Sequence, residues 1–303
     1  MRFSTIAAAL ALTASLVDGH GLVTKITGAN LVVMPGLTVI AGTRRDCQTN
    51  QCGSQRDSAI IRDAEIKAGK AATALGRTQG GGPVSAAKAI ANFMGGTGNS
   101  TTGVNNPAGQ TNGKTAGTNL QGRAAAKAPP AKPKAENQAN VTDTSPAALM
   151  PGVGAANGMP TCSDTGVITM TYHQINGDGA GPLVAKIDAF SGGISPEAFV
   201  VAKMIKNVPG TGGNSKNTMT DFDIAVQMPE GMVCGATVAG VSGVCIVRVN
   251  NAAAAGPFGG AAAFIQSPRA KKRALEFQRL KKRHYARGVV ARNPIGGAEA
   301  NWE

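Results

Sequence analysis

The chain has 303 residues, enough for one large or two small domains, with a formal net charge of +13 at pH 7. Residues 269–303 hold ten Lys or Arg against three Glu, so much of this charge lies in the C-terminal segment. Nucleic-acid binding requires a basic face on the folded part, so we expect no nucleic-acid partner. No apolar run is long enough for a transmembrane segment, and we expect none.

The first 19 residues have the pattern of a signal peptide. Arg2 is followed by an uncharged apolar run at residues 6–12, and Val17 and Gly19 are small residues at positions −3 and −1 of a cleavage site. Cleavage after Gly19 would make His20 the first residue. The sequence therefore predicts a secreted protein, either extracellular or attached to the cell surface.

The segment from His20 to residue 268 is rich in short strand-like runs separated by Gly- and Pro-containing turns. The runs lie at residues 22–26, 37–40, 167–172, 183–190, 222–228, 234–238, 244–249 and 261–265. This pattern favours a mainly β fold. We expect a single antiparallel β-sandwich domain of the immunoglobulin-like or fibronectin-like kind over residues 20–268.

Two short helical patterns, at residues 58–70 and 84–94, predict helical insertions that lie over one side of a sheet. In the run at 244–249, Cys245, Val247 and Val249 share one face by their period of two. Arg248 then marks the opposite face, which we expect to be the wetter one.

Two segments have compositions that do not predict packed structure. Residues 97–157 are dominated by Gly, Asn, Thr, Ala, Pro and Lys without aromatic residues, and this predicts a long disordered loop with glycosylation acceptors at Asn99 and Asn140. Residues 269–303 are expected to form a basic disordered tail. Its Lys-Lys-Arg sequences at 271–273 and 281–283 are typical of sites cut by secretory-pathway proteases.

Five cysteines in an oxidising compartment predict two disulfides and one leftover thiol. Cys234 with Cys245 is the first expected pair, because the two flank a turn between strands. Cys47 with Cys52 is the second, which leaves Cys162. A pairing that involves Cys162 remains an alternative.

The chemistry that the sequence favours is metal binding. Phosphate-loop, dinucleotide and serine-elbow motifs are absent. A histidine at a chain start offers its α-amino group and its ring nitrogen to one metal ion, and the imidazole of His173 would complete a planar set of three nitrogens. Such a set suits Cu(II), and an α-amine with a pKa of about 8 loses its proton on binding. The alternative is that His20 lies near the cleavage site by coincidence and that His173 is a hydrogen-bonded surface residue.

Four stretches and one cysteine, Cys47, carry a resemblance to a known family. The stretches are His20-Gly21, residues 77–83 (RTQGGGP), residues 173–182 (HQINGDGAGP) and residues 251–260 (NAAAAGPFGG). They resemble the fungal Gas/Mas appressorium-specific secreted proteins, also called Egh-like virulence factors. The resemblance implies a secreted or cell-surface protein associated with the appressorium and host penetration. We expect a monomer whose partner is an extracellular polysaccharide or a host surface.

A more distant resemblance is to lytic polysaccharide monooxygenases, which have a mature N-terminal histidine and a second histidine shortly before a Gly-Pro. It implies a copper cofactor held by a histidine brace of His20 and His173. It also places Phe258 at the axial position, with Phe264 as the alternative, and Gln174 or Asp178 in supporting positions. The alternative function is then a copper-dependent, monooxygenase-like enzyme that oxidatively cleaves a wall or cuticle glycan. The competing class is a non-catalytic surface protein.

Overall fold

The computed structural model describes residues 20–40, 43–47, 56–68, 73–78, 82–95 and 150–292, with side chains up to residue 283. The expected signal peptide and both expected glycosylation sites, Asn99 and Asn140, lie outside these residues. None of the helices in the described ranges combines the length and the apolar character that a membrane span requires.

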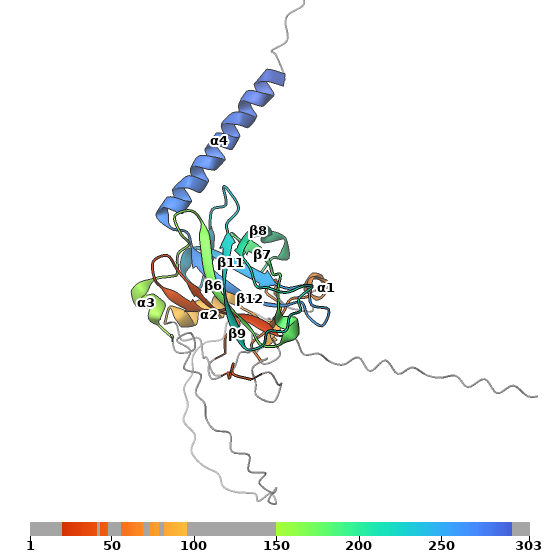
Figure 1. Cartoon of the computed structure of the whole chain (residues 1–303). Helices are drawn as coiled ribbons and strands as arrows, with labels where there is room; N and C mark the ends of the chain where they lie inside the picture. Colours follow the sequence, from red (N-terminus) through yellow and green to blue (C-terminus); the bar gives the residue numbers. More distant parts are fainter. Residues whose placement is uncertain are drawn as a thin grey trace, which may run out of the picture.

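The described part of the chain is mainly β, as predicted (Figure 1). Its strands are β1 (Gly21–Thr27), β2 (Val33–Pro35), β3 (Ala59–Ile60), β4 (Arg77–Thr78), β5 (Gly82–Pro83), β6 (Val167–Gln174), β7 (Val184–Asp188), β8 (Phe199–Lys206), β9 (Thr220–Gln227), β10 (Ala236–Val238), β11 (Val241–Asn250) and β12 (Phe258–Ile265). The helices are α1 (Asp63–Lys67), α2 (Ala86–Phe93), α3 (Val153–Asn157) and α4 (Pro268–Arg292), with 3-10 turns η3 (Gly177–Gly179) and η4 (Pro196–Ala198).

Strand β8 joins the two layers of the sheet. The strand order is β2-β1-β6-β9-β8-β7-β11-β12-β3-β4-β5, with β10 added to β11. The first half of β8 pairs antiparallel with β7, and its second half pairs antiparallel with β9. One continuous sheet therefore folds over itself into two layers, with β2, β1, β6 and β9 in one layer and β7, β11, β12 and β3–β5 in the other.

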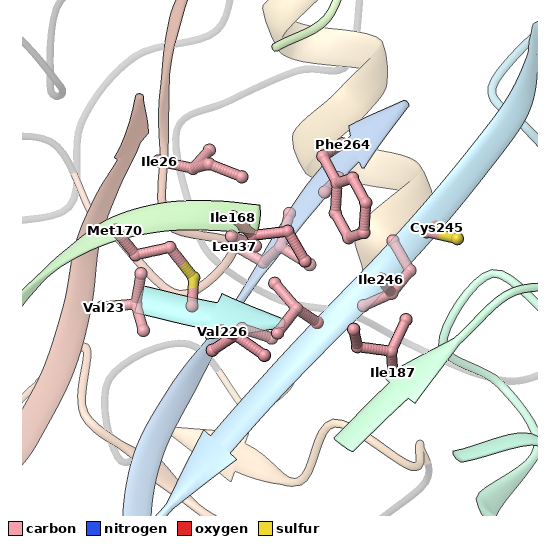
Figure 2. Packing of buried hydrophobic residues seen from close by; sticks show 14 of the residues in the cluster. Val23, Ile26, Leu37, Ile168, Met170, Ile187, Val226, Cys245, Ile246 and Phe264 are labelled. Carbon is pink, nitrogen blue, oxygen red and sulfur yellow. The ribbon is translucent and has the colours of Figure 1, made fainter. Parts of the chain in front are cut away.

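The core lies between these layers because alternate side chains of each strand point inward. Ile168 and Met170 of β6 meet Ile187 of β7 and Phe264 of β12 in one buried cluster (Figure 2). The layers approach each other closely at Gly260, where a Cβ atom would lie 2.6 Å from the backbone nitrogen of Val23. A glycine is needed at this point for β1 to reach β12.

Segments of the insertion between β2 and β6 lie against the outer face of β11 in the second layer. Arg248 of β11, which we expected on the wetter face, is only 3% exposed. Its guanidinium donates to the Ala74 carbonyl, lies 4.8 Å from the ring centroid of Phe199 and is 3.6 Å from Asp63. The expectation for Arg248 was wrong because this insertion excludes water from the face.

Both predicted helical patterns contain helices, although the first is shorter than expected. Within residues 58–70, the first part forms the strand β3, and only α1 is helical. The second pattern corresponds to α2, where the hydroxyl of Ser85 caps the helix by accepting from the Lys88 backbone N–H. This helix contacts β10 and β12, so the predicted position over one side of a sheet is confirmed.

The boundaries of the expected disordered segments need correction. Residues 150–157 belong to the ordered body, because α3 packs on α2 and the Gly152 N–H donates to the Asn92 carbonyl. Residues 268–292 form the helix α4, which extends away from the sandwich (Figure 1). The start of α4 is ordered because Ala270 and Ala274 are buried against the body.

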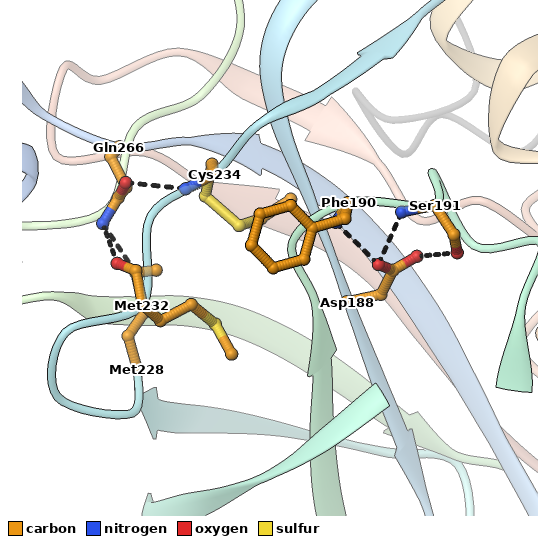
Figure 3. Close-up of a disulfide and its surroundings, with 8 residues drawn as sticks. Asp188, Phe190, Ser191, Met228, Met232, Cys234 and Gln266 are labelled. Atoms are coloured by element: carbon orange, nitrogen blue, oxygen red, sulfur yellow. Dashed lines mark hydrogen bonds between the residues drawn. A yellow bond between two sulfur atoms is a disulfide. The ribbon is translucent and has the colours of Figure 1, made fainter. Parts of the chain in front are cut away.

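The expected disulfide between Cys234 and Cys245 is present (Figure 3). The side chain of Gln266 accepts from the Cys234 backbone N–H beside it. Cys47 is disulfide-bonded, and Cys52, its expected partner, lies outside the described residues. Cys162 is a free, buried cysteine whose thiol pKa is raised by burial, so the alternative with a paired Cys162 is wrong.

Candidate metal centre

The two histidines named from the sequence come together at one end of the sandwich. In the antiparallel register of β1 and β6, Leu22 lies opposite His173, and the Ile175 N–H donates to the His20 carbonyl at 2.9 Å. His20 is two residues before Leu22, so its side chain is on the same face as that of His173. His20, which directly precedes β1, is therefore a diagonal neighbour of His173 on β6, and the two residues are 1% and 6% exposed.

His173 is held in one orientation by a carboxylate. It pairs directly with Asp221 across β6 and β9, and its Nδ1 lies 2.7 Å from Asp221 Oδ1. A carboxylate only accepts, so Nδ1 carries the proton and donates. This bond, supported by the positive charges of Lys25 and Arg45, lowers the pKa of Asp221.

In the neutral imidazole, the other ring nitrogen of His173 keeps its lone pair. Nε2 is buried and has no hydrogen-bond partner among the described residues. A neutral imidazole with Nδ1 on a carboxylate and Nε2 available is the form in which histidine binds metals. The geometry of His173 therefore fits a metal ligand.

His20 is fixed through its backbone and its ring. Its backbone nitrogen donates to Asn176 Oδ1 at 2.6 Å. Its ring lies 4.9 Å from the ring of Phe258, centroid to centroid, with an angle of 31° between the planes. Phe258, the residue matched to the axial position, thus lies beside His20 at the start of β12.

Asp178, one of the expected supporting residues, lies on the loop that packs under His20. A Cβ atom on the next residue, Gly179, would lie 2.0 Å from the His20 carbonyl oxygen, so the loop touches the backbone of His20. The Tyr172 hydroxyl donates to the Gly179 carbonyl, and Asn251 Nδ2 donates to the Asp178 carbonyl. Burial, together with the negative charge of Asp178, raises the pKa of Tyr172.

Gln174, the other expected supporting residue, points to the opposite face from His173, because it is the next residue of β6. Its Nε2 donates to the carbonyls of Asn176 and Asn217 and to the hydroxyl of Ser215. The structure therefore connects Gln174 to the site through Asn176, which accepts the hydrogen bond from His20.

The donor set consists of one backbone nitrogen and two imidazoles. Among the described residues, no group of three His, Cys, Asp or Glu side chains could hold a metal ion. A brace does not need such a group, since its third donor is the α-amine that cleavage after Gly19 would create. The residues present fit a three-nitrogen site.

A family model described as Egh16-like virulence factor matches residues 18–259. The chain belongs to this family. It is 45% identical to appressoria-specific virulence factor GAS2 of Pyricularia oryzae over 96% of this chain and 98% of the relative. It is 29% identical to appressoria-specific virulence factor GAS1 of the same fungus, over 91% of this chain and 84% of that protein. No solved structure gives a significant match.

The family match confirms the resemblance found in the sequence. The region shared with the Egh16-like family begins just before His20 and ends within β12. It includes both histidines and Phe258, and it leaves out α4.

Sequence reasoning on this Egh16-like chain missed Asn176 and Asp221. Asn176 lies within the quoted motif of residues 173–182, where a polar side chain three residues after His173 was a usable signal. Asp221 carries no local signal, because only the pairing of β6 with β9 places it opposite His173.

Proposed function

We propose that this member of the Egh16-like family is a secreted protein that begins at His20 and binds one copper ion through a histidine brace. The α-amine and ring of His20 and Nε2 of His173 would hold the ion. The observation that carries the proposal is the state of His173. Asp221 orients the ring of His173. Nε2 of His173 is buried, lies on the face that His173 shares with His20, and has no hydrogen-bond partner among the described residues.

The hydrogen bond between the His20 nitrogen and Asn176 is compatible with a metal at that nitrogen. A neutral amine has one lone pair for the ion and keeps two N–H groups, one of which can donate to Asn176 Oδ1. Nitrogen donors in a plane favour Cu(II) over other divalent first-row metals. When bound, copper supplies one-electron redox chemistry.

We further propose that the protein acts outside the fungal cell, at the appressorium, in host penetration. Its relatives are named appressoria-specific virulence factors, and the similarity extends over nearly the whole chain. An extracellular polysaccharide or a host surface is the proposed partner.

The copper proposal is tested by Cu(II) titration and electron paramagnetic resonance on protein that begins at His20. We expect one tight site with nitrogen hyperfine structure. One added Ala before His20 removes the α-amine from the site, and His173→Ala removes the second imidazole, so both variants should lose tight binding.

His284→Ala is the matched control, because this histidine lies in α4. That helix follows the far end of β12, whose first residue, Phe258, lies beside His20. This variant should bind like the unmodified protein. Equal thermal unfolding temperatures must show that the variants are folded. If the extended protein binds Cu(II) with unchanged affinity and spectrum, there is no brace.

The contact between Phe258 and His20 favours a second candidate, oxidative cleavage of a wall or cuticle glycan by the copper-loaded protein. It ranks second because the chain has two tyrosines and one tryptophan. Tyr172 is fully buried, so few aromatic side chains are available to stack on a crystalline polysaccharide.

This second candidate is tested by incubating the copper-loaded protein with a reductant and chitin, cellulose or cuticular glucan. Oxidised oligosaccharides that are absent with His173→Ala would establish the activity. Their absence for every glycan, with copper bound, would leave the non-catalytic surface protein.

A further inference from the structure

Helix α4 contains the sequence Lys-Lys-Arg twice, at residues 271–273 and 281–283. An endoprotease that recognises Lys-Arg binds several residues on each side of the scissile bond in an extended form. The helix must therefore unwind locally before either site can be cut. The site with the lower free energy of local opening is cut first.

The first sequence lies in the part of α4 that is docked on the sandwich. Ala270 and Ala274, on either side of it, are buried against the body. The side chain of Arg273 donates to the Asp164 carbonyl at 3.2 Å. The Asp164 carboxylate accepts from the hydroxyl of Ser267, just before the helix, at 2.9 Å and is 3.4 Å from Arg269. Unwinding the helix here would break these contacts and expose apolar surface.

The second sequence lies beyond the docked part. Among the side chains that the structure describes, the hydrogen bond furthest along α4 to the body joins Gln278 Nε2 to the Gly231 carbonyl at 2.7 Å. Leu280 is 53% exposed, and residues 281–283 are also exposed. The side chains of residues 281–283 make no hydrogen bond or ion pair with described residues. Figure 1 shows this part of the helix extending into solvent.

A helix without packing is marginal in water, and three adjacent positive charges repel one another. Local opening at residues 281–283 therefore costs much less free energy than opening at residues 271–273. The two sequences are identical in their residues, so this difference in docking decides between them.

We propose that the Arg283–His284 bond is a proteolytic processing site for a secretory-pathway endoprotease that cuts after Lys-Arg, and that the Arg273–Ala274 bond is protected. In this hydrolysis the C–N bond breaks. Water adds its hydroxyl group to the Arg283 carbonyl carbon and a proton to the His284 nitrogen. The body keeps the docked half of α4, and residues 284–303 are released.

The test is limited proteolysis of the full-length folded protein with a Lys-Arg-specific endoprotease, followed by intact-mass measurement. We expect a product that ends at Arg283, formed at least about tenfold faster than any product that ends at Arg273. Replacing Lys282 and Arg283 by alanine should remove this product. Replacing Lys272 and Arg273 by alanine should leave it unchanged.

Asp164→Ala provides the complementary variant, because it removes the acceptor of Ser267 and the partner of Arg269. It should loosen the start of α4 and make the bond after Arg273 cleavable. A first cut after Arg273 in the unmodified protein would overturn the proposal. A peptide of residues 266–292 is the control for the protease, and the proposal would also fail if this peptide is cut at both sites while the folded protein stays intact.

Discussion

At the scale of single residues, His173 is the residue whose geometry best supports the proposed role of metal ligand. Asp221 fixes its protonated nitrogen, and Nε2 faces the side of the sheet that carries His20. Both histidines could be named from the sequence, because the expected signal cleavage site precedes His20 and the resemblance to monooxygenases draws attention to the Gly-Pro after His173. Asp221 could not be named, since its role depends on the register between two strands that lie far apart in the chain.

Asp221→Asn should weaken Cu(II) binding by about 10–100-fold, because partners of this kind fix the tautomer and the basicity of a ligating imidazole. A competition titration with a copper chelator measures the change. Asp223→Asn is a matched control, since Asp223 lies two residues further along β9, its side chain is as exposed as that of Asp221 (67%), and it faces Lys206. Equal effects of the two substitutions would show that only general surface charge matters.

At the scale of elements, β11 shows what a strand pattern can and cannot predict. The period of two correctly placed Cys245, Val247 and Val249 on one face, because alternation is a property of the strand itself. What covers the opposite face depends on an insertion about 170 residues earlier in the chain, as the bond from Arg248 to Ala74 shows. The exposure of Arg248 was therefore not predictable from its neighbours.

Arg248→Met should lower the free energy of unfolding by about 2 kcal/mol, because the buried Ala74 carbonyl loses a charged donor. Urea denaturation measures this change. Lys186→Met is the control on the neighbouring strand, since Lys186 pairs with Arg248 in the register and is 3.9 Å from Asp63. It should change stability much less, and a loss equal to that of Arg248→Met would argue against the bond to Ala74 as the cause.

At the scale of the whole molecule, the mainly β fold and the Cys234–Cys245 disulfide were predictable. Both follow from short runs, turns and cysteine spacing along the chain. The turn of β8 from one layer into the other and the docking of α4 were not predictable, because both depend on contacts between distant segments. The weak apolar periodicity of α4 gave little indication that Ala270 and Ala274 would be buried.

The division of α4 into a docked part and a free part predicts how truncations affect stability. A chain that ends at Arg283 should unfold at the same temperature as the full-length protein. A chain that ends at Gln266 should unfold about 2–6 °C lower, because it loses the apolar contacts of Ala270 and Ala274 and the bond from Ser267 to Asp164. Differential scanning calorimetry compares the three chains, and equal losses in both truncated chains would contradict this division.

The hydrogen bonds at His20 affect how easily an aminopeptidase could remove residues from a chain that begins there. The backbone of this residue is held on both sides, by the bond from its nitrogen to Asn176 and by the bond from Ile175 to its carbonyl. An aminopeptidase must draw the first residues of its substrate out of the fold and into its own cleft. In a chain that begins at His20, that step would require β1 to separate from β6, so the new terminus would resist trimming for as long as the sandwich stays folded.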